Sequence, residues 1–216
     1  GATNFNSLVT TNSGIHQANG AGLVTFFKDV TVQGAGDTPN TFDANVVLDG
    51  LTFTSNQDTT FGNSGSDTLT INSSPTLVDT SGNDANVTIN SATTINADLT
   101  VSTGFGDITQ NGTVNGANAL TYNSAGLTAI HGAIGSGTPV TSLTTDAAGQ
   151  TDLDANVTAD GSAITFNDVV NLISSVIVTG LTATDLTFDN TVDGAQNLTL
   201  NVGEKNNFND DVGSNT

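Results

Sequence analysis

The sequence predicts an all-β chain that folds as a right-handed parallel β-helix, a solenoid of roughly ten coils of about 20–22 residues each. Three observations predict this fold: a composition rich in turn-forming and β-branched residues, a long internal repeat, and a finer period within that repeat. Because these patterns extend along the whole chain, we expect one solenoid over residues 1–216. We expect it to be less regular over 1–90 and regular over 91–216.

The composition favours many short strands and a thin core. The chain has 24 Gly and 3 Pro together with abundant Asn, Asp, Ser and Thr, so turn residues interrupt it every few positions and no long helix is expected. Only 35% of the residues are hydrophobic and 5% aromatic, yet Val, Ile, Leu and Thr recur in evenly spaced clusters. Disordered chains are depleted in β-branched residues, so disorder is the less favoured interpretation.

The charge of the chain excludes several classes of partner. The chain has 21 acidic residues and only two basic ones, Lys28 and Lys205, which gives a formal net charge of −19 at pH 7. Nucleic acids and anionic membrane surfaces need clustered cations, so neither is expected as a partner. The chain has no Cys, so disulfides are not expected to hold the fold, and no apolar run has the length that membrane insertion requires.

The sequence contains a long internal repeat, which appears when residue 107 is laid on residue 185. Segment 107–138 then lies without gaps on segment 185–216, and 12 of the 32 aligned positions are identical. The match includes apolar positions, such as Val114 with Val192 and Leu120 with Leu198. Repetition on this scale is typical of solenoids, propellers and arrays.

A finer period predicts the length of one coil. Phe166, Phe188 and Phe208 follow one another at intervals of about 20–22 residues. Apolar clusters within each period lie about 10–12 residues apart, which predicts at least two strands in each coil. Since equivalent residues of neighbouring parallel strands lie about 4.8 Å apart, the three rings are expected to stack in the core.

The motif Asp-Ala-Asn-Val occurs at 43–46, 84–87 and 154–157. Around the last copy, apolar and polar residues alternate strictly, which predicts an apolar inner face and a plane of short polar side chains outside. The outward polar residues around this copy superficially resemble a calcium-binding loop, but Val157 occupies the position where such a loop needs glycine for its sharp turn. We therefore expect no cofactor and at most weak calcium binding. Its candidate ligands are Asp152, Asp154, Asn156 and Asp160.

No catalytic site is predicted. His16 and His131 are the only histidines and no Cys can join them, so we interpret both as surface residues and expect no enzyme activity. A carbohydrate-active or carbohydrate-binding β-helix stays open as the alternative. No pair among the carboxylates stands out in the sequence as the catalytic pair of a hydrolase. The chain has no Trp, and Tyr122 is its only tyrosine, so aromatic side chains on which a sugar could stack are scarce. An ice-ordering face would need regular Thr-x-Thr ranks, and the threonines look scattered.

Three segments, 106–124, 137–172 and 185–203, resemble the repeat regions of very large bacterial β-strand-repeat surface proteins, which are related to filamentous haemagglutinins and autotransporter passengers. The resemblance covers the C-terminal half well and the N-terminal half loosely. It implies secretion, a right-handed β-helix and a structural or adhesive role at the cell surface, with host or cell-surface glycans as the ligand class. It carries over no catalytic residue.

The two ends of the sequence predict an axial array. Residues 3–12 lie in register with 151–160, and residues 212–216 match 134–138, so both ends break off within the repeat pattern. Uncapped parallel coils expose strand edges that favour pairing with another strand. We therefore expect the coils to continue end to end, either into further repeats of the same polypeptide or into copies of this chain.

Overall fold

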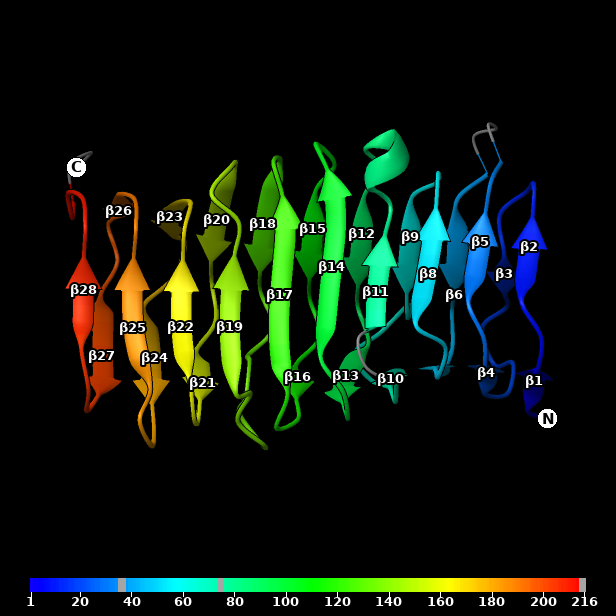
Figure 1. The fold of residues 1–216 in the computed structure, drawn as a ribbon, viewed down its shortest axis with the longest axis horizontal. Coiled ribbons are helices and arrows are strands. Elements are labelled where there is room, and N and C mark those ends of the chain that lie inside the picture. Colours follow the sequence, from blue (N-terminus) through cyan, green and yellow to red (C-terminus); the bar gives the residue numbers. More distant parts are fainter. Residues whose placement is uncertain (35–37, 74–75, 214–216) are drawn as a thin grey trace.

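The computed structural model describes residues 1–34, 38–73 and 76–213, and it is an all-β solenoid. Short strands wind through three parallel sheets, here called A, B and C, in the repeating order A, B, C along the chain. We call one such set of three a level. Figure 1 shows the levels side by side along one axis, with the two termini at opposite ends. The right-handed sense of the winding stays a prediction.

Sheet B has ten strands, sheet C has nine, and sheet A consists of a six-stranded and a three-stranded part. The strands of sheet B are β2 (Val9–Thr11), β5 (Val30–Val32), β8 (Thr52–Ser55), β11 (Thr76–Asp79), β14 (Leu99–Gly104), β17 (Ala119–Ser124), β19 (Ser142–Thr145), β22 (Ala163–Phe166), β25 (Asp185–Phe188) and β28 (Asn206–Phe208). Those of sheet C are β3 (His16–Gln17), β6 (Asn40–Phe42), β9 (Thr59–Phe61), β12 (Val87–Ile89), β15 (Ile108–Gln110), β18 (Leu127–Ile130), β20 (Gln150–Leu153), β23 (Val169–Leu172) and β26 (Val192–Asp193). Those of sheet A are β1 (Thr3–Phe5), β4 (Val24–Phe26), β7 (Val46–Leu48), β10 (Thr68–Ile71), β13 (Ala92–Ile95) and β16 (Val114–Asn115), then β21 (Val157–Ala159), β24 (Val176–Gly180) and β27 (Leu198–Val202).

Isolated bridges complete the levels. Ile134 pairs with both Val114 and Val157, which joins the two parts of sheet A, and Val212 pairs with Val192 at the end of sheet C. The first level is therefore β1, β2 and β3, and the last is β27, β28 and Val212. Among the described residues, one 3-10 turn, η1 (Ser81–Asn83), projects from the corner between sheets B and C.

The predicted coil period is confirmed in the C-terminal half, where Phe166, Phe188 and Phe208 are direct partners in consecutive strands of sheet B. Several steps in the N-terminal half are longer than predicted. Val30 pairs with Phe53, and Phe53 pairs in turn with Val78. The extra residues lie in the corners, where loop length costs little free energy.

The long internal repeat does not superpose equivalent levels. Ile108 lies on sheet C whereas its match, Leu186, lies on sheet B, and Val114 on sheet A matches Val192 on sheet C. The shift from segment 107–138 to segment 185–216 therefore covers three full turns of the solenoid and then two more sheets. The repeated unit is thus one short strand with its corner, and not one whole level. The faces share an alternating inward and outward pattern, which explains why the sequence aligns across them.

One continuous core fills the interior. Inward residues of all three sheets, mostly Val, Ile, Leu and Phe, form a single buried cluster from Val24 to Val192. The strands are too short to bury a core alone, because most contribute one or two inward residues and the longest contribute three. Stacking of the levels supplies the missing contacts, as it does in repeat proteins generally.

Candidate functional site

The four candidate calcium ligands do not converge on one point. Asp152 lies on β20, Asp154 and Asn156 in the corner that follows, and Asp160 beyond β21, so the predicted single strand face is wrong. Each side chain has its own partner. Asp152 accepts from Gln150 at 2.6 Å, Asn156 from the backbone N–H of Ile177 at 2.8 Å, and Asp160 from that of Thr182 at 3.0 Å.

His131 pairs with Asp154, one of the four. Its Nδ1 lies 3.1 Å from Asp154 Oδ2, and both side chains are partly exposed. Hydrogen bonding by the side chains of Ser174 and His131 holds the pKa of Asp154 below its usual range. His16 lies on β3 of the first level, where its Nδ1 is 2.8 Å from Thr41 Oγ1, whereas His131 follows β18 on the sixth level. The two histidines therefore do not meet.

The three predicted core rings stack face to face. The ring centroid of Phe188 is 5.1 Å from that of Phe166 and 5.0 Å from that of Phe208. Phe166 and Phe188 are fully buried, whereas Phe208, in the last strand that the structure describes, is 39% exposed. A second aromatic group, missed in the sequence, lies in the first three levels, where Phe42 stacks on Phe61 with centroids 5.2 Å apart.

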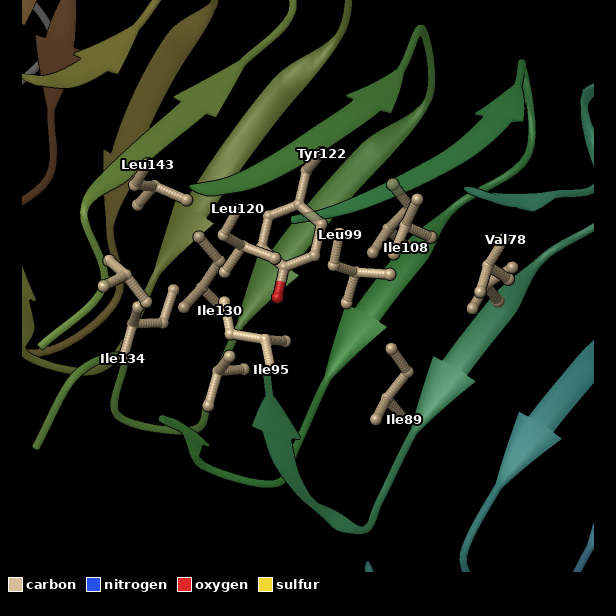
Figure 2. Close-up of a cluster of buried hydrophobic side chains, with 14 of the residues drawn as sticks. Val78, Ile89, Ile95, Leu99, Ile108, Leu120, Tyr122, Ile130, Ile134 and Leu143 are labelled. Carbon is tan, nitrogen blue, oxygen red and sulfur yellow. The ribbon is translucent and has the colours of Figure 1, made fainter. Parts of the chain in front are cut away.

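Tyr122 is not available as a sugar platform. Its ring is fully buried, and its hydroxyl donates to Gln110 Oε1 at 3.0 Å. Figure 2 shows the ring among inward side chains that include Leu99, Leu120 and Ile130. Burial raises the pKa of this phenol well above its usual value. The carbohydrate alternative therefore loses the one aromatic surface considered for it.

Asp and Asn side chains at the corners join each level to the next. In this contact, which we call the Asx clasp, a side-chain oxygen accepts the backbone N–H of a residue 20–28 positions later, at 2.6–3.2 Å. The acceptors are Asp29, Asn45, Asp58, Asp84, Asn86, Asp98, Asp107, Asn115, Asn156, Asp160 and Asp185.

The Asx clasp gives a structural role to seven of the 21 acidic residues of the chain. Corners interrupt the sheet hydrogen bonds and leave N–H groups that need acceptors. A short carboxylate or amide reaches the next level without crossing the core. Asn side chains of neighbouring levels also bind one another directly, as Asn111 Nδ2 does to Asn90 Oδ1 at 2.8 Å.

The core carries polar groups where sheet B turns into sheet C, which the alternation did not predict. Asn40 donates to Ser55 Oγ at 2.8 Å and to Thr59 Oγ1 at 3.0 Å. Asp168 is 1% exposed and accepts from Thr145 Oγ1 at 2.7 Å and Thr151 Oγ1 at 2.8 Å. Burial raises the pKa of Asp168 despite these two bonds. These groups satisfy one another, as buried polar groups must.

The threonines are more ordered than the sequence suggested. Five of them are partners in consecutive strands of sheet B and form one outward column: Thr100, Thr121, Thr144, Thr165 and Thr187. Two residues after each of these five threonines lie Ser102, Asn123, Asp146, Asn167 and Asp189 rather than threonine. The column is therefore regular but single, and the Thr-x-Thr ranks expected of an ice-ordering face do not form on this part of sheet B.

Comparison with known proteins gives no relative: no family model, no curated protein and no solved structure matches this chain. Across residues 1–34, 38–73 and 76–213, no helix is long and apolar enough to span a membrane. Within the same residues, no group of three or more His, Cys, Asp or Glu side chains is placed to hold a metal ion.

Proposed function

We propose that this chain is a structural or adhesive module of an extracellular, bacterial surface array, in which the solenoid serves as a stiff axial element. The observation that carries the proposal is the continuous stack of ten paired strands in sheet B over one uninterrupted core. Bending such a rod would separate sheet hydrogen bonds, Asx clasps and core contacts at the same level. A module of this kind holds its two ends at a fixed separation.

The outer surface suits a rod that works beside other rods. Its outward columns consist largely of Thr, Asn, Asp and Ser, and the chain carries a net charge of −19. Like charge on neighbouring rods opposes side-by-side aggregation of their flat faces. The secreted location is supported by the resemblance of the repeats to those of bacterial surface proteins.

Labelling of intact cells tests the proposal. Antibodies raised against the recombinant chain should bind unpermeabilised cells of the source organism, and brief protease treatment of those cells should remove the signal. A cytosolic protein of the same cells serves as the control for leakage. Recovery of the antigen only from the cytosolic fraction would contradict the extracellular role.

Adhesion is tested separately from the structural role. Beads that carry the folded chain should bind host cells or immobilised glycans more strongly than beads that carry the heat-unfolded chain. Failure of that binding removes the adhesive part and leaves a spacer. The stiffness is tested by the distance between two outward positions of sheet B, Thr52 and Thr187.

A further inference from the structure

A notch lies on the edge of the solenoid where sheet B turns into sheet C. In the third level this corner consists only of residues 56–58, whereas in the fourth level it runs over residues 80–86 and includes η1. Figure 1 shows η1 projecting beyond the corner that joins β8 to β9. The step between the two corners holds a cavity of about 430 Å³, which we call the notch. Sites for small ligands usually have about 300–1,000 Å³, so the notch is large enough for one.

The lining of the notch is mostly polar. Its polar members are Asn56, Gln57, Asp58, Asn83 and Asp84. Asn83 Nδ2 donates to the carbonyl oxygen of Asn56 at 3.0 Å, which ties the wall in the fourth level to the floor in the third. The described residues that line the notch include no Lys, Arg or His.

Each of the two carboxylates in the notch has one oxygen that the fold does not use. Asp58 Oδ1 accepts the backbone N–H of Asn86 at 2.8 Å, and Asp84 Oδ1 accepts that of Phe105 at 2.9 Å. These clasps hold both side chains in place. Within the described part of the chain, nothing donates to Oδ2 of either residue. Both oxygens can therefore accept from a ligand.

Gln57 gives an independent indication of a ligand. Its side chain lines the notch and is only 8% exposed. Nε2 donates to the carbonyl oxygen of Gly34, but Oε1 accepts no hydrogen bond from any described residue. A buried acceptor without a donor costs free energy, so a ligand that brings a donor into the notch gains stability there.

An exposed aromatic ring lies on the same edge, one level beyond η1. Phe105 follows β14 in the fifth level and is 77% exposed. Its backbone N–H is the group that Asp84 binds, so Asp84 contacts both the notch and the residue that carries the ring. The floor of the notch and Phe105 are two level spacings apart, which is about 10 Å. One sugar ring cannot contact both, whereas a short oligosaccharide can.

The chemistry of this edge favours an uncharged sugar chain. Sugar hydroxyls donate to carboxylate and amide oxygens, and the apolar face of a sugar ring packs on an aromatic ring. Two aspartates and a net charge of −19 disfavour an anionic ligand. A calcium ion takes roughly six to eight oxygen ligands, and two carboxylates that each have one oxygen engaged supply few of them.

We propose that this edge binds a neutral oligosaccharide, with one sugar unit in the notch and a later unit stacked on Phe105. Hydroxyls of the first unit donate to Asp58 Oδ2, Asp84 Oδ2 and Gln57 Oε1. The inference rests on the adhesive part of the proposed function, and it names the binding site and the ligand class.

An array of neutral and anionic oligosaccharides, probed with the full chain, tests the ligand class. Neutral members should bind, and the strongest of them should titrate in solution with one site per chain. Anionic members of the same length should bind roughly tenfold more weakly or not at all. An array on which nothing binds, or only anionic members bind, would overturn the proposal.

Two variants test the position of the site. Phe105→Ala removes the exposed ring, and Asn56→Ala removes an amide that lines the notch and has no side-chain partner among the described residues. Each should weaken the titrated affinity roughly tenfold or more while the circular dichroism stays unchanged. Phe27→Ala is the matched control, because Phe27 is an exposed phenylalanine on the corner between sheets A and B. Affinity that is insensitive to Phe105→Ala and Asn56→Ala, or that falls equally with Phe27→Ala, contradicts the assigned edge.

Calcium chloride alone is titrated as the competing ligand. Asp84→Asn keeps an oxygen for the clasp to Phe105 and removes the charge. We expect no stoichiometric calcium binding at the notch. Calcium binding with whole-number stoichiometry that Asp84→Asn abolishes, in a chain that binds no sugar, would assign the notch to a cation and overturn the proposal.

This site and the proposed function can fail separately. If beads that carry Phe105→Ala bind host cells as strongly as beads that carry the unaltered chain, adhesion stands and this site is wrong. If a neutral oligosaccharide binds at this edge but intact cells do not label from outside, the site stands and the surface location is wrong.

Discussion

Phe188 lies in the middle of the three-ring stack inside sheet B. Its side chain is 0% exposed, and its ring lies within 11° of parallel to both neighbours. Phe188→Ala removes a fully buried ring, which costs about 3–5 kcal/mol of unfolding free energy. The two ring contacts account for roughly 0.5–1.5 kcal/mol each within that total.

Urea denaturation followed by circular dichroism measures this loss, with two matched controls. Phe208→Ala removes a ring that is 39% exposed and stacks on Phe188, so it should cost about half as much. Phe105 is 77% exposed, and Phe105→Ala should change stability by less than about 0.5 kcal/mol. The inward register of sheet B is refuted if Phe188→Ala costs no more than Phe105→Ala.

Three further changes probe the corners. Asp98→Ala should lose about 0.5–1.5 kcal/mol in the same urea assay by removing an Asx clasp, whereas Asp98→Asn keeps the acceptor and should be nearly neutral; equal losses would contradict the clasp. Burial raises the pKa of Asp168, so the folded chain binds the carboxyl proton more tightly than the unfolded chain does. The contribution of Asp168 to the free energy of unfolding therefore falls as the pH rises from the pKa of the unfolded chain, about 3.9, through the pKa of the folded chain. Asp168→Asn should flatten this fall between acid and neutral pH, and identical pH profiles for the two proteins would exclude the effect. Gly132→Ala places a Cβ against the backbone oxygen of Gly112 and should cost about 1–3 kcal/mol, while Gly65→Ala meets nothing within 4 Å and should be neutral. A neutral Gly132→Ala would argue against such close packing of the corners.

The sequence predicted the fold because core stacking repeats residue types at equivalent positions. Phe166, Phe188 and Phe208 mark one coil each, so their spacing gave the coil length directly. The sequence pattern predicted at least two strands in each coil and did not reveal the third. Strands such as β16 and β26 are so short, Val114–Asn115 and Val192–Asp193, that a pattern of alternation cannot show in them.

The corner contacts could not be predicted because they depend on which residue lies across the level boundary. Asp98 binds the N–H of Ala119 in the next level, and nothing local to Asp98 distinguishes it from an ordinary turn residue. The error over Asp152–Asp160 has the same origin. Alternation continues through the corner between β20 and β21, so the sequence pattern does not separate these two strands, which lie on different faces.

A distance between two outward positions tests the axial stack most directly. Thr52 and Thr187 are far apart in sequence but lie in the same column of sheet B, six level spacings apart in the fold. The chain has no Cys, so Thr52→Cys with Thr187→Cys can carry two spin labels without interference. Pulsed electron paramagnetic resonance, with labelled chains diluted in unlabelled ones, should give one narrow distribution near about 29 Å. A broad distribution that extends past roughly 60 Å, as in an unfolded segment of this length, would contradict the stack.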